Sequence, residues 1–458
     1  MIATLNPATG EVVARFAPCP PAQVESALEG AFRAPRLWRQ TAMDERSRLL
    51  TAVASVLRER KNRYAALITL EMGKPIVEAE AEIEKCAVTC DFYATHAAGF
   101  LADEPVTSNA SMSRVSFDPL GLVLAVMPWN YPFWQVVLFA APALAAGNGA
   151  VLKHANNVPQ CALALQEVFR DAGAPKGLFL TLLVEASEVK ALIEDRRIAA
   201  VTLTGSTPVG KMVASQAGAV LKKQVLELGG SDPFIVLADA DLETAAKAAV
   251  KARFQNAGQS CICAKRFIVE ERIADSFVDA LRDFAQELKV GDPMDRSTAM
   301  GPMARHNLRA ALHEQLQRTV QQGGTLLLGG RLPEGPGAYY PPTVIDRVTD
   351  RMAAGCEETF GPVASVLRVR SAEEAIELAN GSEFGLGAGL WTRDMERAER
   401  LTRQIDAGAV FVNGLVASDP RLPFGGLKQS GYGRELGSYG IREFTNIKTV
   451  WIGPARAA

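Results

Sequence analysis

The feature that most constrains the fold is a long stretch, from Pro119 to Leu152, that contains no Asp, Glu, Lys or Arg. It is long enough to cross a bilayer. Three prolines interrupt it, however, and proline is poorly tolerated inside a helix. We therefore expect a buried strand over 121–126, a loop and an apolar helix over 133–146, with a membrane-spanning helix as the alternative. The N-terminus lacks the basic start and apolar core of a signal peptide.

Outside this stretch, short apolar runs alternate with amphipathic segments, a pattern typical of an α/β protein with parallel sheets. The first hundred residues have mainly helical spacing, and two α/β units meet near residue 230. A helix over 241–258 is predicted from the run DLETAAKAAVKARFQNAG. Further buried strands are predicted at 149–153, 178–183, 199–204, 232–237 and 265–271.

The composition favours a small-molecule partner. The 458 residues carry a formal net charge of -2, which gives no basic surface for nucleic acid or an anionic membrane. Seven cysteines are too few and too scattered for a secreted disulfide scaffold, so we expect a reducing, cytoplasmic setting. Cys261 and Cys263 have no histidine beside them, and we therefore expect no metal site there.

The segment TGSTPVGKMV, residues 204–213, nearly matches the phosphate-binding loop of nucleoside triphosphatases. It follows a predicted strand and opens a predicted helix, so backbone N–H groups would face a phosphate. Met212 stands where that loop needs a hydroxyl for magnesium, and a thioether is a poor ligand for this ion. Asp239, at the end of FIVLAD, resembles the second motif of these enzymes, although Asp239 or Asp241 would also cap a helix. A triphosphatase and a dinucleotide-binding protein both remain open on this segment alone.

Three residues carry chemistry that a dinucleotide-dependent enzyme could use. Cys261 lies in a loop, where a lone cysteine is usually a small apolar filler. Glu227 precedes a Gly-Gly turn, where burial would tune a carboxyl toward a general base, although a solvated Glu at a strand end is the usual case. Asn130 lies on a proline-fixed loop, from which its amide could donate to an oxyanion. A non-catalytic binding protein is the alternative.

Eight motifs, in order and from end to end, resemble those of the NAD(P)-dependent aldehyde dehydrogenase superfamily. The resemblance implies an α/β fold with a Rossmann-like dinucleotide-binding domain over 1–100 and 120–227 and an α/β catalytic domain over 228–431. It also implies a β bridging element over 101–119 and 432–458, in a homodimer or homotetramer. The motifs are NPATGE (6–11), EMGKP (71–75), PWNYP (128–132), TGSTPVG (204–210), LELGG (226–230), FQNAGQSC (254–261), EETFGPV (357–363) and PFGGLKQSGYGRE (423–435).

Position by position, the resemblance assigns Cys261 as the nucleophile, Glu227 as the general base and the Asn130 side chain as half of an oxyanion hole. A thiolate attacks the aldehyde, hydride leaves as a thioester forms, and Glu227 activates the water that releases the acid. Because Glu227 is present, we expect hydrolysis rather than acyl transfer to coenzyme A. Lys211 has no catalytic part in this scheme. The implied contacts to NAD or NADP are Trp129, Lys153, Asn156, Gly205, Ser206, Gly210, Glu358 and Phe360.

The predicted helix end just before Cys261 conflicts with this assignment. The negative end of a helix dipole would oppose a thiolate. Whatever lowers the Cys261 pKa therefore has to come from elsewhere in the fold.

The whole chain is most similar to the bacterial succinate-semialdehyde dehydrogenase branch. Two positions at which that branch often has a carboxylate-binding arginine are Leu138 and Gln255 here. Ser418 matches a substrate-side serine of the branch, and Arg421 could replace an arginine, although a solvated Arg is the usual case. Trp134 and Leu138 could instead line an apolar tunnel. Succinate semialdehyde is therefore the first expectation, and a broad range of aliphatic or aromatic aldehydes is the second.

Two further questions stay open on the sequence. In the family, a carboxylate three residues after the cofactor lysine favours NAD and a small hydroxyl admits NADP. Asn156 is neither, so both cofactors remain. Cys263 suggests a redox switch through a Cys261–Cys263 disulfide, but residues so close in sequence form a strained bridge, and a buried small residue is the alternative.

Overall fold

In the computed structural model, which describes residues 1–453, the charge-free stretch forms a strand, a loop and a helix, as predicted. These are strand β5 (Leu122–Met127) and helix α5 (Trp134–Ala145), followed by strand β6 (Gly149–His154). Every residue of α5 is buried. Among the helices of residues 1–453, none is long and apolar enough to cross a membrane.

A six-stranded sheet surrounds β5, in the order β19-β9-β8-β5-β6-β7. The strands from β9 to β7 are parallel, and β19 joins β9 antiparallel. Side chains alternate across a strand, so Val123 and Ala125 pack into one hydrophobic core and Leu122 and Leu124 into another. The remaining strands are β7 (Phe179–Thr181), β8 (Ile198–Thr204), β9 (Lys223–Glu227) and β19 (Gly431–Tyr432).

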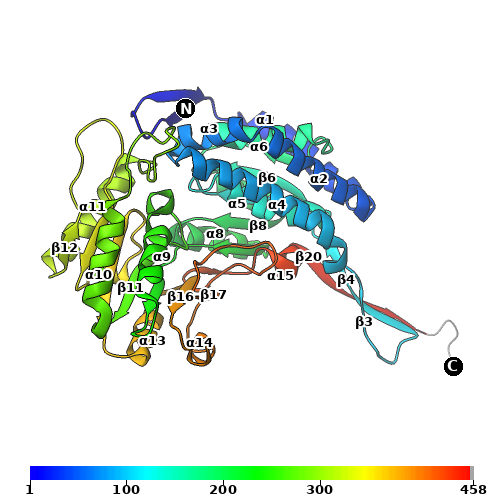
Figure 1. Ribbon diagram of the computed structural model, residues 1–458. Coiled ribbons are helices and arrows are strands. Elements are labelled where there is room, and N and C mark those ends of the chain that lie inside the picture. The colour runs from blue at the N-terminus through cyan, green and yellow to red at the C-terminus, as the bar shows by residue number, and fades with distance from the viewer. Residues whose placement is uncertain (454–458) are drawn as a thin grey trace.

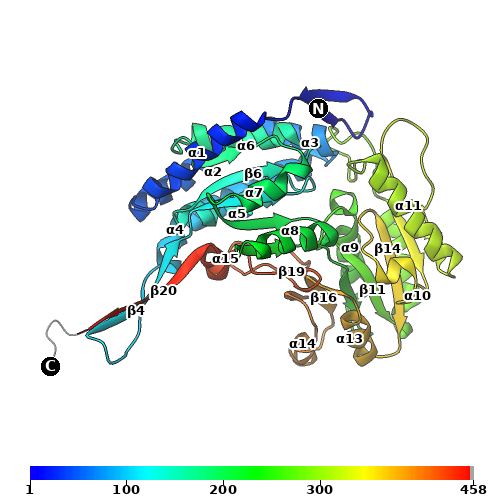
Figure 2. The same ribbon diagram turned by 180° about the vertical axis from the view of Figure 1, so that it is seen from behind.

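Helices cover both faces of this sheet, as a parallel sheet requires (Figure 1, Figure 2). The core that contains Leu122 and Leu124 is closed by α1, α7 and α8. The core on the other face lies under α5 and α6, with α2, α3 and α4 packed outside them. The bounds are α1 (Pro21–Trp38), α2 (Met43–Glu59), α3 (Lys61–Met72), α4 (Ile76–Phe100), α6 (Pro159–Asp171), α7 (Val189–Glu194) and α8 (Thr207–Ala219).

A seven-stranded sheet forms the second unit, in the order β12-β13-β14-β11-β10-β16-β17. Only β12 is antiparallel to its neighbour among these strands. The strands are β10 (Asp232–Val236), β11 (Ala264–Glu270), β12 (Thr325–Leu328), β13 (Thr343–Asp346), β14 (Val363–Val369), β16 (Gly387–Trp391) and β17 (Ala409–Val412). The helices are α9 (Leu242–Phe254), α10 (Glu271–Gln286), α11 (His306–Gln321), α12 (Ala353–Cys356), α13 (Ala372–Asn380) and α14 (Met395–Thr402).

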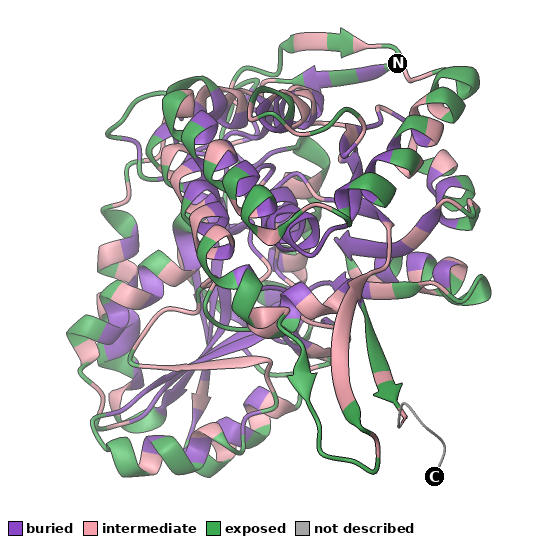
Figure 3. Ribbon diagram, turned by 90° about the vertical axis from the view of Figure 1, so that its right-hand side faces the viewer, coloured by how far each residue is buried: buried purple, intermediate pink, exposed green. Residues whose placement is uncertain are grey.

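Three smaller sheets complete the fold. The alternating segment near the C-terminus needs a partner edge, and β20 (Thr445–Ile452) pairs along its whole length with β4 (Met112–Pro119). Together with β3 (Glu104–Pro105) they form an arm that projects from the body (Figure 1). Both large sheets are mainly buried, whereas the arm carries exposed residues (Figure 3). The other elements are β1 (Ile2–Leu5), β2 (Val12–Phe16), β15 (Phe384–Gly385), β18 (Leu427–Lys428) and α15 (Gly437–Glu443).

The predicted helix over 241–258 is wrong at its end. Asp241 caps α9 by accepting from the Thr244 N–H, as expected of one of the two aspartates. The helix stops at Phe254, because Asn256 and Ala257 adopt left-handed backbone angles, with φ of 53° and 52°. Cys261 therefore follows a tight left-handed turn rather than a helix end, and the conflict with the helix dipole no longer holds.

Glycine is required where β19 meets β9. Gly431 has a φ of 112°, and a Cβ at this position would overlap the carbonyl oxygen of Leu226. We expect Gly431→Ala to lower the free energy of unfolding by about 3 kcal/mol or more, because backbone strain and a steric clash act together. Chemical denaturation measures this change.

Gly218, in the last turn of α8, is the matched control because a Cβ there meets no atom within 4 Å. Gly218→Ala should leave stability unchanged or raise it by about 0.5–1 kcal/mol. Equal effects of the two substitutions would contradict this description of β19.

Candidate active site

The candidate cofactor residues lie where the strand order of the six-stranded sheet reverses. β6 follows β5 on one side of it, and β8 returns on the other side. In open parallel sheets, ligands bind outside the carboxyl ends of the strands at such a point. Trp129 and Asn130 follow β5, and Gly205 and Ser206 follow β8. Lys153 lies near the end of β6.

The structure joins Lys153 to Asn156 and adds a carboxylate that the sequence did not indicate. Lys153 Nζ donates to Asn156 Oδ1 at 2.9 Å, and Asn156 Nδ2 donates to Glu185 Oε2 at 2.7 Å. Lys153 is 7% exposed, and burial lowers its pKa. A buried ammonium whose bonded partner is an amide has donors to spare for hydroxyls of a ligand.

The segment that resembles a phosphate loop presents backbone rather than a lysine. Ser206 is the N-cap of α8, and its side chain makes no capping hydrogen bond. Lys211 and Met212 are exposed on α8. Gly210 lets α8 approach β9, because a Cβ there would overlap the side chain of Leu228. The free N–H groups at the start of α8 can therefore bind a phosphate without help from Lys211.

The other predicted cofactor residues lie near the link between the two large sheets. Glu358 Oε1 accepts from the Gly230 N–H at 3.0 Å and lies 3.6 Å from Lys265 Nζ. The Phe360 and Trp129 rings meet edge to face, with centroids 5.9 Å apart. Residues from both sheets therefore contribute to one area.

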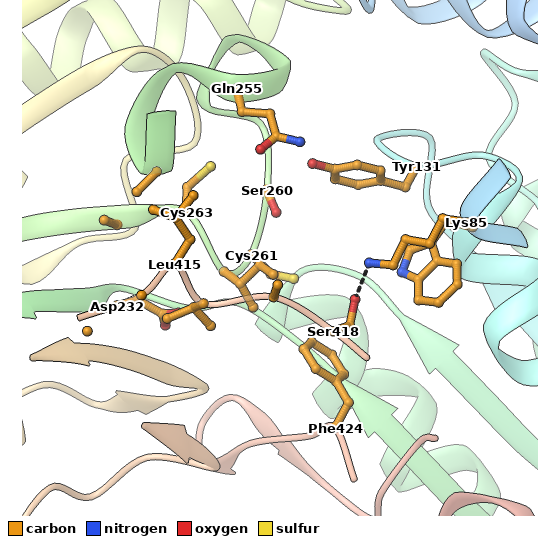
Figure 4. A pocket seen from close by; sticks show the side chains of 18 of the residues that line it. Lys85, Tyr131, Asp232, Gln255, Ser260, Cys261, Cys263, Leu415, Ser418 and Phe424 are labelled. Atoms are coloured by element: carbon orange, nitrogen blue, oxygen red, sulfur yellow. Dashed lines mark hydrogen bonds between the residues drawn. The ribbon is translucent and has the colours of Figure 1, made fainter. Parts of the chain in front are cut away.

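Cys261 opens into a pocket between α4, α5 and the second sheet (Figure 4). Of the four predicted substrate residues, Trp134, Gln255 and Ser418 line this pocket. Leu138 does not, because it lies one turn further along α5, where it is 1% exposed within the hydrophobic core. Arg421 is exposed and paired with Asp419, and it is also outside the lining.

Asn130 is held directly beside the turn that carries Cys261. Its Nδ2 donates to the backbone oxygen of Gln259 at 3.1 Å, and its own backbone oxygen accepts from Asn256 Nδ2 at 2.9 Å. An amide nitrogen has two hydrogens. One hydrogen fixes the orientation of the side chain and the second makes no hydrogen bond among residues 1–453, although Asn130 is not part of the pocket lining.

Lys265 is the group that works against the burial of Cys261. Burial raises the pKa of the Cys261 thiol above its ordinary value, and the Lys265 charge lowers it. The fully buried Lys265 Nζ donates to the backbone oxygens of Ser260 at 2.9 Å and of Cys261 at 2.8 Å. Its charge is thus fixed at the cysteine, and this is the contribution that the sequence did not locate.

Glu227 is buried beside a second carboxyl group. It is 2% exposed, and neither of its oxygens has a hydrogen-bond partner within residues 1–453. Burial raises its pKa well above the usual range, and the charge of Glu435 raises it further. Glu435 is also buried, and its pKa is raised to about 8. A carboxyl with a raised pKa suits a general base, although Glu227 is not part of the pocket lining.

Residues from α4 were missed in the sequence. Glu78, Glu82 and Lys85 line the Cys261 pocket. Their spacing of four and three places them on one helix face, but charged residues at helical spacing usually form a solvated face. Glu82 forms a buried ion pair with Lys74, and its Oε1 accepts from the N–H groups of residues 133 and 134 at the start of α5. Burial raises the pKa of Glu78 to about 7.

Cys263 is unpaired and 5% exposed. Figure 4 shows its sulfur directed away from that of Cys261. The redox switch therefore stays a prediction. Within residues 1–453, no group of three His, Cys, Asp or Glu side chains is placed to hold a metal ion.

Known proteins resemble this chain over its full length. The sequence model described as the aldehyde dehydrogenase family matches residues 1–450. A probable NADP(+) succinate-semialdehyde dehydrogenase of Synechocystis sp. is 52% identical over 451 residues, which cover 98% of this chain and 99% of that protein. The NAD(P)+ succinate semialdehyde dehydrogenase Sad of Escherichia coli is 50% identical over 448 residues, with 98% and 97% covered. The crystal structure of succinic semialdehyde dehydrogenase from Streptococcus pyogenes with NADP+ has a TM-score of 0.97 and 37% identity, and covers 99% of this chain and 100% of that one.

The pairing of Glu227 with Glu435 predicts a pH effect. Glu435→Gln removes a negative charge that raises the Glu227 pKa, so that pKa should fall. A base is active when deprotonated, and the acid limb of the kcat profile should therefore move to lower pH. The rate on this limb should rise about tenfold for each unit by which the pKa falls.

Steady-state rates of aldehyde oxidation between pH 6 and 9, a range of about three pH units, locate the acid limb of the kcat profile. Glu399→Gln, on the exposed side of α14, is the matched control and should leave the profile in place. A limb that stays where it is, or moves to higher pH, in Glu435→Gln would contradict the coupling of the two carboxyls.

Proposed function

The chain belongs to the aldehyde dehydrogenase family, and we propose that it oxidises succinate semialdehyde to succinate with NADP or NAD. The observation that carries the proposal is the pocket in which Cys261 faces Ser418, the residue that the resemblance places beside the substrate. Two of its relatives, which are named succinate-semialdehyde dehydrogenases, share about half of its residues over nearly the full length, which supports the same substrate.

The first step is attack of the Cys261 thiolate on the aldehyde carbon. The sulfur–carbon bond forms and the carbonyl oxygen becomes an oxyanion. The free hydrogen of Asn130 Nδ2 and the backbone N–H of Cys261 donate to this oxygen. Loss of one such donor costs about 10²–10³ in rate.

The residues at the strand ends fit a dinucleotide. The start of α8 offers free backbone N–H groups for a diphosphate, and the buried Lys153 has donors left for ribose hydroxyls. Asn156, Ser206, Glu358 and Phe360 would complete the contacts. When bound, the nicotinamide supplies the hydride acceptor that converts the adduct on Cys261 into a thioester.

Glu227 then completes the reaction by hydrolysis. It takes a proton from water, the resulting hydroxide attacks the thioester carbon, and the carbon–sulfur bond breaks to release the acid and the thiolate. The burial of Glu227 and the charge of Glu435, which both raise the Glu227 pKa, support this hydrolytic step. The presence of this base favours water over coenzyme A as the acyl acceptor.

A broad range of aldehydes is the second candidate function. The observations in its favour are Leu138 and Gln255, where the branch often has arginines, and the aromatic walls of the pocket. These walls are formed by Tyr131, Trp134 and Phe424. Such a surface would also accept apolar aldehydes.

We also propose that the arm joins copies of the chain into a homodimer or homotetramer. Ile447, Trp451 and Ile452 on β20 are 63%, 53% and 45% exposed. Apolar side chains on an exposed edge strand favour association.

The unpaired state of all seven cysteines supports a reducing, cytoplasmic setting.

The substrate proposal predicts the outcome of an aldehyde panel. Succinate semialdehyde should give a higher kcat/KM than hexanal or benzaldehyde, because only a substrate with a carboxylate can use polar groups in the pocket. Absorbance of the reduced nicotinamide measures the rate with each cofactor. A clear lead for hexanal or benzaldehyde would overturn the assignment.

The contact between Glu185 and Asn156 predicts a change of cofactor preference. Glu185→Gln removes a negative charge near the expected 2′-phosphate position, so the ratio of kcat/KM with NADP to that with NAD should rise about fivefold. Glu188→Gln is the matched control, because Glu188 accepts from the Glu185 backbone rather than from Asn156. If the ratio of kcat/KM with NADP to that with NAD does not rise in Glu185→Gln, the cofactor ribose does not bind next to Glu185.

A further inference from the structure

The proposed substrate has a carboxylate for which the Cys261 pocket, as the described residues line it, offers no arginine partner. Leu138 lies in the core, and Gln255 is neutral. A carboxylate inside a pocket needs a charged or hydrogen-bonding partner, because an unpaired buried charge is costly. The inference below rests on the proposed function, since it concerns the acid end of the same substrate.

Lys85 is the single cation among the described residues that line the Cys261 pocket. It projects from α4 and is half-buried. No carboxylate within residues 1–453 lies within ion-pair distance of it. A lysine withdrawn from solvent is normally paired with an anion, so Lys85 has capacity for one.

The surroundings of Lys85 fix its ammonium group and leave donors free. Its Nζ donates to Ser418 Oγ at 2.7 Å and lies 4.1 Å from the centroid of the Trp134 ring. An ammonium has three hydrogens, so at least one remains after these two contacts. The Ser418 hydroxyl accepts from Lys85 and keeps its own hydrogen to donate.

We propose that Lys85 Nζ and the Ser418 hydroxyl together bind the substrate carboxylate, with one donor for each oxygen. Figure 4 shows both groups on the side of the pocket toward which the Cys261 sulfur is directed. A short semialdehyde held by its acid end would therefore present its aldehyde to the thiol. Lys85 takes the place of the arginines that positions 138 and 255 lack.

The acidic groups near Lys85 do not take the place of the substrate carboxylate as its partner. Glu82 is paired with Lys74 and accepts two backbone N–H groups. Asp419 is bound by Arg421, with Nε at 2.8 Å from Oδ1. Burial raises the pKa values of Glu78 and Asp232 to about 7, which reduces their negative charge. The pocket thus keeps a cation that its own carboxylates leave available.

The test compares a carboxylated aldehyde with a neutral one of the same chain length. Lys85→Met keeps the stem over Trp134 and removes the charge. We expect its kcat/KM for succinate semialdehyde to fall about 10- to 100-fold, mainly through KM, because a charge-assisted hydrogen bond is lost. For butanal, kcat/KM should change by less than about threefold. Lys85→Arg should retain most of the preference.

Two further variants separate recognition from folding and from general electrostatics. Ser418→Ala leaves α4 intact, and it should cost about tenfold with succinate semialdehyde alone. Lys251→Met removes a charge from an exposed lysine of α9 outside the pocket lining, and it should leave the preference unchanged. Thermal unfolding of each variant checks the fold.

The outcomes distinguish this inference from the proposed function. If Lys85→Met loses the same factor with both aldehydes, or loses nothing, Lys85 does not bind the carboxylate, and the inference is overturned while the substrate stands. If the unmodified enzyme itself prefers butanal, the proposed function and the inference both fail.

A pH profile gives an independent readout. Burial lowers the pKa of Lys85 to about 8. The titratable groups that face it are Glu82, Cys86 and Lys74 from α4 and its preceding loop, and Asp419 from the C-terminal segment, and burial raises the pKa of the Cys86 thiol so that it stays neutral. The preference for succinate semialdehyde over butanal should therefore decline above pH 8 in the unmodified enzyme. In Lys85→Arg it should persist, because an arginine stays charged. The same decline in both would overturn the inference.

Discussion

The site depends on a set of hydrogen bonds that joins the loop after β5 to the turn before Cys261. Asn130 donates to Gln259 and accepts from Asn256, and the Gln259 side chain accepts from the Ala304 N–H at 2.9 Å. Glu78 accepts from the Asn256 backbone at 2.9 Å. These bonds hold Asn256 and Ala257 in left-handed angles that side chains rarely adopt, and they fix the turn before Cys261 to the loop that follows β5.

This placement sets the electrostatics of the site. Glu227 and Asp232 are buried and Cys261 is half-buried, and the loss of solvent favours the neutral form of each. Lys265 is fixed by backbone oxygens of the cysteine turn, where its charge favours the thiolate. The fold therefore combines a buried carboxyl with a raised pKa, Glu227, and a cation fixed at the cysteine turn, Lys265.

Much of this could be predicted from the sequence, because local patterns decided it. The apolar strand, loop and helix over 119–152 and the glycine turn before α8 follow from residue type and spacing. The resemblance to family motifs assigned the predicted catalytic roles of Cys261, Glu227 and Asn130. The end of α9 could not be predicted, since the turn at Asn256 and Ala257 is imposed by partners from other segments.

Residues that act through long-range burial were also missed. Lys85 and Glu82 resemble a solvated helix face until α5 and the segment around Ser418 cover them. Leu138 is the opposite case, a residue predicted at the pocket that lies in the core. It is one helical turn beyond Trp134, which forms the pocket wall. Glu185 contacts Asn156 because β6 and β7 are parallel neighbours, so that the segments that follow these two strands lie side by side.

In the proposed mechanism, Cys261 carries the substrate as a thioester that Glu227 hydrolyses. The most direct test is to mix a Glu227→Gln variant with succinate semialdehyde and NADP, quench with acid, and map the acylated peptide by mass spectrometry. We expect one succinyl group on the peptide that contains Cys261, together with one equivalent of reduced cofactor. An unmodified Cys261 after the reduced cofactor has formed, or an acyl group on another residue, would contradict this mechanism.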